Sequence, residues 1–258
     1  QSPEKAGGAY YVTDLAAKDI TPAPEGFEPF YINGYFRHGA RQIDDPVTYV
    51  RIYECMETAQ ATDNLTDFGL AMYQRLAGQK QNVYYREGDL TQIGYAQLRE
   101  MGKRMVDNYP SVFQGDAYLK ANATNVLRVA ASMQSFVQGV TSKRPELPWA
   151  EIDNSKAHLS TIHPYGTQCP TKKPIDVRMY THDSPWFKLY SEYRASRINP
   201  DVFLQRMFKD IEVVKAKYEP FDLVWRFWLM ACVQQCLDRN VPMWDLFTEE
   251  EILAWAEV

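Results

Sequence analysis

The chain has 258 residues, of which 45% are hydrophobic and 24% charged, and its formal net charge is −5. This length is enough for one large domain or two small ones with a real hydrophobic core. The negative charge argues against nucleic acid as a partner, and no apolar run is long enough to span a bilayer. An anionic ligand therefore needs a local positive site on this chain.

The first 29 residues predict an extended arm, because "ITPAPEGFEP" contains three prolines and a glycine and has no helical period. The chain starts at Gln1, and its first residues are small and polar. We expect a mature periplasmic or secreted chain that has lost an export signal; an arbitrary starting point is the alternative. Residues 30–36, "FYINGYF", are rich in aromatic and β-forming residues and predict a buried strand.

The next part of the chain predicts four helices and one short strand-like link, "YLKANAT". The helices are expected over residues 46–62, 66–80, 91–109 and 124–140. Thr91 is placed to cap the third of them, and Pro110 follows its end. Apolar residues of the fourth form one stripe, which indicates an amphipathic helix.

From about residue 185 onward the sequence is mostly helical in pattern. Asn199 followed by Pro200 is typical of a helix start, and Thr248 with Glu251 fits a capping box. We therefore expect three consecutive parts: an arm (1–29), an α/β core (30–184) and a helical cap subdomain (185–258).

Four cysteines are present: Cys55, Cys169, Cys232 and Cys236. An even number permits disulfides without showing them. Cys232 and Cys236 lie four residues apart in a helical pattern, which favours two buried thiols one turn apart. The spacing of cysteines and histidines matches no structural zinc site.

The stretch "FRHGAR" follows the expected strand and places Arg37, His38 and Arg41 around Gly39. Ligands of α/β folds bind beyond the carboxyl ends of strands, and glycine allows the backbone to turn or approach a ligand. Arginine donates two parallel hydrogen bonds to phosphate, and its charge favours the neutral form of a neighbouring histidine. A neutral imidazole is a nucleophile, so the stretch predicts phosphoryl transfer; a surface loop with two solvated arginines is the alternative.

Three ordered segments resemble the histidine phosphatase superfamily, in the branch of acid phosphatases, phytases and multiple inositol polyphosphate phosphatases. "YFRHGAR" resembles the RHGxR signature of this branch. "GDLTQIGYAQLREMGKRM" is similar to the helix that follows it, and "ATNVLRVAASMQSFVQGV" to a third segment that carries an arginine, here Arg128. A helix start with an arginine is also a physically reasonable anion site.

The resemblance implies an α/β fold with a Rossmann-like, mostly parallel sheet, flanking helices and an inserted helical subdomain. It implies His38 as the nucleophile, with Arg37, Arg41 and Arg128 as phosphate ligands. The expected activity is that of a histidine-type acid phosphatase, a phosphomonoesterase that acts on small-molecule phosphate esters, with phytate-like inositol phosphates as one option. It implies neither a cofactor nor a metal.

The chain departs from the family pattern in two respects. Asn122 stands where the third segment carries another arginine, so it can bind a substrate by hydrogen bonds but adds no charge. The family's acid motif lies beyond the helical domain, whereas the one HD dipeptide here, His182-Asp183, precedes it; we interpret it as a turn or a helix start. We interpret His158 and His163 as structural or surface residues. We also expect the C-terminal part of the family fold to be absent from this chain.

Two other functions compete with phosphatase activity. A catalytically weak or inactive relative would bind phosphate esters without turnover, which Asn122 and the missing acid motif favour. A helical interaction module, in which "FRHGAR" is incidental, would bind no phosphate.

Overall fold

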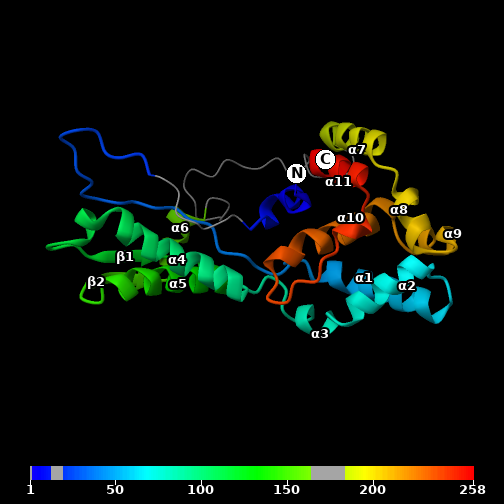
Figure 1. Ribbon diagram of the computed structural model, residues 1–258, viewed down its shortest axis with the longest axis horizontal. Helices are drawn as coiled ribbons and strands as arrows, with labels where there is room; N and C mark the ends of the chain where they lie inside the picture. Colours follow the sequence, from blue (N-terminus) through cyan, green and yellow to red (C-terminus); the bar gives the residue numbers. More distant parts are fainter. Residues whose placement is uncertain (1, 13–19, 164–183) are drawn as a thin grey trace. The chain divides into compact units, whose positions relative to one another are not determined.

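The computed structural model describes residues 2–12, 20–163 and 184–258 (Figure 1). The described chain is mixed α/β, mostly helical, with a parallel sheet of two strands. It divides into two compact units. A helical unit comprises Gln1–Tyr11, Gln42–Gly88 and Pro174–Val258, and an α/β unit comprises Val12–Arg41 and Asp89–Lys173.

The helical unit is built from short elements with well-defined ends. They are η1 (Pro3–Tyr10), α1 (Pro46–Ala61), α2 (Asp67–Ala77), α3 (Lys80–Val83), α7 (Pro185–Arg197), α8 (Pro200–Met207), α9 (Ile211–Lys215), α10 (Pro220–Val233), η5 (Gln234–Cys236), η6 (Trp244–Leu246) and α11 (Glu249–Glu257). The expected caps are confirmed: Asn199 accepts a hydrogen bond from the first turn of α8, and Thr248 forms a capping box with Glu251. Ser184 caps α7 in the same way as Asn199 caps α8.

This unit departs from the consecutive division expected from the sequence. Residues 42–88 pack with the C-terminal helices because contacts distant in sequence join them. Thr66 donates its backbone N–H to the carbonyl of Met207 (3.1 Å), and the Asn64 side chain donates to the carbonyl of Asp210 (2.9 Å). Its core is aromatic, with Phe203 5.3 Å from Phe227 and 5.0 Å from Phe247 between ring centroids.

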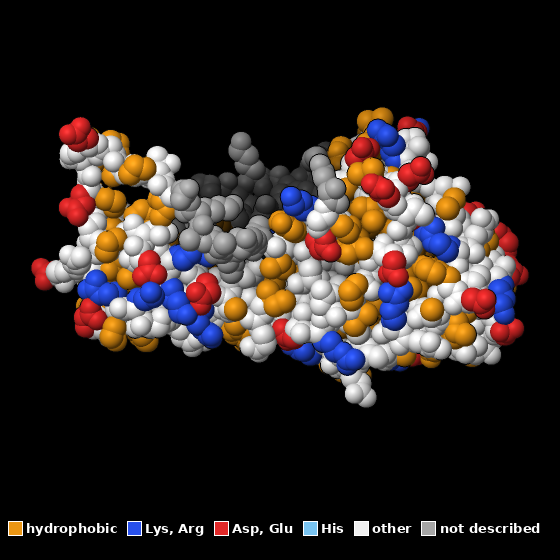
Figure 2. Space-filling model, viewed as in Figure 1, with side chains coloured by type: hydrophobic (Ala, Val, Ile, Leu, Met, Phe, Trp, Pro, Cys, Tyr) orange, Lys and Arg blue, Asp and Glu red, His pale blue; other side chains and the backbone are white. Residues whose placement is uncertain are grey.

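The described cysteines, Cys55, Cys232 and Cys236, are buried in this unit, and Cys236 Sγ donates to the carbonyl of Tyr10 (3.1 Å). The prediction of two buried thiols is therefore confirmed for Cys232 and Cys236. Cys169 lies outside the described residues. Figure 2 shows acidic and basic side chains interspersed over the described residues of the face in view, as a small net charge would suggest. None of the described helices is both long and apolar enough to span a membrane.

The α/β unit contains α4 (Gln92–Asn108), η2 (Pro110–Phe113), β1 (Leu119–Asn122), α5 (Leu127–Lys143), β2 (Trp149–Asp153), η3 (Lys156–His158) and α6 (Leu159–Ile162). Strands β1 and β2 pair in parallel, with Asn122 opposite Asp153 at their carboxyl ends. The Thr91 hydroxyl caps α4, as predicted.

Helices α4 and α5 lie side by side (Figure 1) because both present glycine at their contact. A Cβ atom at Gly102 would lie 2.3 Å from the carbonyl oxygen of Phe136, and one at Gly139 would lie 2.0 Å from that of Arg99. Beside this contact Val106, Phe113, Val140 and Leu147 form a buried cluster. The close approach fixes the positions of α4 and α5, and so of their N-terminal turns, relative to each other.

The prediction of a buried strand over residues 30–36 is wrong, because this segment forms no strand. Among the described residues β1 and β2 pair only with each other, so nothing hydrogen-bonds to 30–36 as a ladder. Most of its side chains are accordingly open to solvent, with Phe30 91% and Tyr35 74% exposed, whereas Ile32 packs against the buried cluster. Two contacts hold its end: Phe36 packs on Phe136 with ring centroids 5.3 Å apart, and the Tyr35 hydroxyl donates to the carbonyl of Ile162 (3.0 Å).

Candidate functional site

The loop "FRHGAR" is held to the α/β unit through its backbone. The N–H of Ala40 donates to Gln97 Oε1 on α4 (2.7 Å), and the N–H of Gly39 donates to Ser132 Oγ on α5 (3.1 Å). The carbonyl of Ala40 accepts from the backbone N–H of Thr91 (3.0 Å). The loop is therefore fixed between the N-terminal turns of two packed helices, although the segment that leads into it is not a strand.

Two glycines allow the loop to approach α4 this closely. A Cβ atom at Gly39 would lie 2.5 Å from the carbonyl oxygen of Gly94, and one at Gly94 would lie 2.2 Å from that of Ala40. Any other residue at either position meets backbone rather than a movable side chain. Glycine at 39 thus serves helix contact, in addition to any approach of the loop to a ligand.

The hydrogen bond of His38 identifies which ring nitrogen is free to react. Its Nδ1 lies 2.8 Å from the backbone carbonyl oxygen of Gly39. A carbonyl can only accept, so in a neutral imidazole the proton is on Nδ1 and the lone pair is on Nε2. The pKa of His38 is lowered mainly by burial, which outweighs the raising effect of the Gly39 carbonyl.

Three arginines add to this lowering of the His38 pKa: Arg41, Arg37 and Arg128, in that order. Arg37 and Arg41 flank His38 in the chain, whereas Arg128 arrives from the first turn of α5. The structure thus brings together all four residues that the sequence predicted as catalytic. Val126 at the N-cap of α5 provides no side-chain hydrogen bond, so the positive end of the helix that carries Arg128 has no side-chain cap.

Asn122, predicted to bind substrate, lies at the end of β1 beside a carboxylate. With its amide oriented so that both ends find partners, Nδ2 donates to Glu151 Oε1 (3.0 Å) and to the carbonyl of Ala121 (3.1 Å). Its role in phosphate binding stays a prediction. The contact shows that a carboxylate lies beside the position at which the family pattern carries an arginine.

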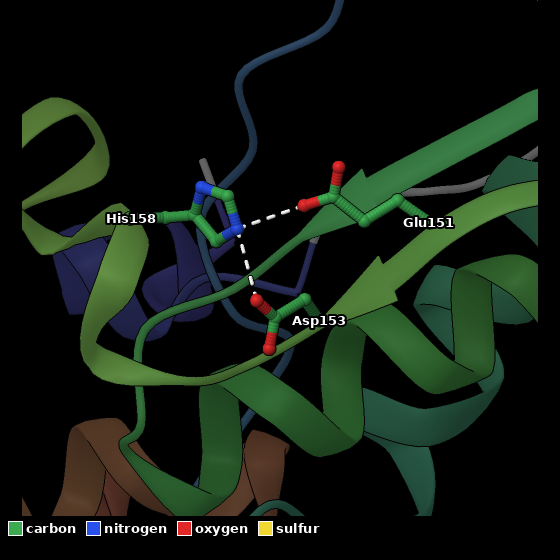
Figure 3. Close-up of side chains that lie close together, drawn as sticks. All are labelled: Glu151, Asp153 and His158. Atoms are coloured by element: carbon green, nitrogen blue, oxygen red, sulfur yellow. Dashed lines mark hydrogen bonds and ion pairs between the residues drawn. The ribbon is translucent and has the colours of Figure 1, made fainter.

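The sequence interpretation missed a cluster next to Asn122. His158, taken as a structural or surface residue, has its Nε2 2.8 Å from Glu151 Oε1 and 2.9 Å from Asp153 Oδ2 (Figure 3). The available signal was the spacing of Glu151 and Asp153, since residues two apart in a strand face the same side. The pair His182-Asp183 lies outside the described residues, so its interpretation stays a prediction.

A histidine with a free Nε2 and three arginines in an α/β unit is typical of enzymes that transfer phosphoryl groups through histidine. The chain belongs to the histidine phosphatase superfamily (branch 2), whose family model matches residues 35–258. This confirms the resemblance on which the site was predicted. None of the curated proteins matches the chain.

Two solved structures of a multiple inositol polyphosphate phosphatase from Bifidobacterium longum are similar in fold. The complex with inositol hexasulfate has a TM-score of 0.64 at 14% identity and covers 95% of this chain and 65% of that one. The apo form has a TM-score of 0.61 at 13% identity and covers 92% of this chain and 62% of that one. The chain therefore spans less than two thirds of these phosphatases, and the likeness confirms the α/β fold class with helical additions.

Proposed function

We propose that the chain carries the nucleophilic half of a phosphatase site, which hydrolyses phosphate monoesters through a phosphohistidine on His38. The observation that carries this proposal is the gathering of Arg37, Arg41 and Arg128 around His38, together with its lowered pKa. Positive charge binds the phosphate, and burial together with the same charge keeps the nucleophile neutral.

In the first step the lone pair on His38 Nε2 attacks phosphorus, a P–N bond forms, and the bond from phosphorus to the ester oxygen breaks. The Gly39 carbonyl accepts a hydrogen bond from Nδ1–H, which stays protonated, and so stabilises the positive charge that develops on the ring. The arginines offset charge on the three non-bridging oxygens. In the second step water attacks phosphorus, the P–N bond breaks, and inorganic phosphate and neutral His38 are released.

The leaving oxygen takes a proton from an acid in the first step, and a positioned acid contributes typically ~10²–10⁴ in rate. The described residues around His38 in the α/β unit supply arginines rather than an acid. We propose that aryl phosphates, whose leaving groups need little help, are turned over faster than alkyl phosphates such as those of inositol. The names of the structural neighbours support inositol phosphates as one substrate class.

A second candidate function is a relative that binds phosphate esters and turns them over weakly or not at all. The specific observation in its favour is the contact of Asn122 with Glu151, which puts a carboxylate beside the residue expected to bind substrate. An exported location stays a prediction for either function.

Hydrolysis of p-nitrophenyl phosphate and of phytate by the unmodified chain, His38→Ala and His163→Ala tests the proposal. His163 is the matched control, because it is a histidine of the same unit outside the site. We expect turnover of the aryl ester that His38→Ala abolishes and His163→Ala leaves unchanged. Equal turnover by His38→Ala would rule out the nucleophile, and phosphate binding without any turnover would favour the second candidate.

A further inference from the structure

Three potential metal ligands converge at the carboxyl end of β2 (Figure 3). Glu151 and Asp153 project to the same side of the strand, and His158 returns toward them from η3. Nε2 of His158 lies 2.8 Å from Glu151 Oε1 and 2.9 Å from Asp153 Oδ2. The potential ligand atoms of the three residues all lie within 4.8 Å of one another.

The remaining oxygens of both carboxylates are held by other groups. Lys120 Nζ pairs with Glu151 Oε2 (2.6 Å), and the backbone N–H of Ser155 donates to Asp153 Oδ1 (2.7 Å). Each carboxylate thereby presents one oxygen toward His158 in a fixed orientation, which is how groups around a metal site hold its ligands.

Hydrogen bonding explains only part of this arrangement: the Asn122 amide donates to Glu151 Oε1 (3.0 Å), yet His158 Nε2 also lies within contact of both carboxylates. Nε2 of an imidazole carries at most one proton, directed along one line in the ring plane, so it cannot point at two carboxylates together. The Oδ2 atom of Asp153 also accepts from the Ser155 hydroxyl (2.9 Å). Separations near 3 Å are about those between adjacent ligands of an ion bound at roughly 2.1 Å to each.

We propose that Glu151, Asp153 and His158 bind a divalent transition-metal ion such as Zn²⁺ or Mn²⁺. Imidazole favours zinc, copper, iron and nickel, and carboxylates favour harder ions such as manganese, so one nitrogen and two oxygens suit this class. With three protein ligands the ion keeps positions open for water. The site is separate from His38, and the proposal does not depend on phosphatase activity.

A bound ion would change both structure and charge at this edge of the sheet. It would cross-link β2 to the turn that follows it. It would also offset two negative charges that now lie beside Asn122.

Calorimetric titration of the metal-free chain with Zn²⁺ tests this site, with His158→Ala and His163→Ala as matched variants. We expect the unmodified chain and His163→Ala to bind one ion alike. Loss of an orienting partner typically costs 10–100-fold in metal affinity, so loss of the ligand in His158→Ala should cost at least about 100-fold. Absence of binding by the unmodified chain, or unchanged affinity in His158→Ala, would overturn the proposal.

Glu151→Gln is a second variant that tests the site even if His158→Ala does not fold. It keeps the side-chain volume and a hydrogen-bond acceptor for Lys120 but removes an anionic ligand. We expect at least about 10-fold weaker Zn²⁺ binding with unchanged circular dichroism. Visible absorption of the Co²⁺-loaded chain gives a second readout, since its spectrum should change in Glu151→Gln and not in His163→Ala. An unchanged affinity and spectrum in Glu151→Gln would equally overturn the site.

Discussion

Substitution of Gly94 by alanine tests whether helix contact positions the catalytic loop. The added Cβ would lie 2.2 Å from the carbonyl oxygen of Ala40, 2.7 Å from Leu90 Cδ1 and 2.9 Å from the backbone nitrogen of Ala40. Ordinary contact begins at 3.4 Å, so the loop must move by about 1 Å. The movement would strain the hydrogen bond from the Ala40 N–H to Gln97.

The size of the effect follows from two opposing contributions to the free energy of unfolding. Overpacking costs about 1–3 kcal/mol, and the upper end applies here because the clash is with backbone. Alanine in place of glycine within a helix raises the free energy of unfolding by about 1 kcal/mol. We therefore expect Gly94→Ala to lower the free energy of unfolding by about 2 kcal/mol. A 1 Å displacement near the reacting atoms costs roughly 10²-fold in rate, so kcat/KM for p-nitrophenyl phosphate should fall by about that factor.

Urea unfolding and steady-state kinetics measure both effects, with Gly78→Ala as the control. Gly78 has a helical backbone, and a Cβ there would meet its nearest atom, the Arg75 carbonyl oxygen, at 3.6 Å. The same chemical change should therefore leave Gly78→Ala as stable and active as the unmodified chain, or slightly more stable. Gly94→Ala with unchanged stability and unchanged kcat/KM would refute the idea that this contact positions the loop.

Three further predictions concern the charges of the site. Arg128→Ala should weaken competitive inhibition by vanadate about 10–100-fold, since a charge-assisted hydrogen bond contributes about 1.5–3 kcal/mol, and unchanged inhibition would remove Arg128 from the site. Because the pKa of His38 is lowered, the ring stays neutral to a lower pH than an ordinary histidine does. Its NMR titration midpoint and the acid limb of kcat/KM should both lie below the ordinary value of about 6.5, and a midpoint above it would contradict this prediction. Alanine at both His182 and Asp183 should leave turnover of p-nitrophenyl phosphate largely unchanged, whereas its loss in a folded variant would identify the acid there.

Local signals in the sequence predicted the helices well. Thr91, Asn199 and Thr248 cap helices as expected, because a cap depends on residues within one turn of it. The prediction of a strand over residues 30–36 was wrong for the converse reason. A strand needs partners elsewhere in the chain, and aromatic composition alone does not supply them.

The site was predictable only where a motif carried it. Arg37, His38 and Arg41 are neighbours in sequence, and the family pattern added Arg128. Gln97 and Ser132, which hold the loop, gave no signal, because their roles depend on how α4 and α5 pack.

The cluster of Glu151, Asp153 and His158 could not be predicted from the sequence for a similar reason. It combines a spacing of two residues within β2 with a turn that brings His158 back to the strand. The spacing could be read from the sequence, whereas the turn could not.

Rapid quenching of the chain with a ³²P-labelled aryl phosphate tests the central claim most directly. The account predicts an acid-labile, base-stable phosphoenzyme, with the label on His38 by mass spectrometry and absent from His38→Ala. Label on another residue, or equal labelling of His38→Ala, would contradict it.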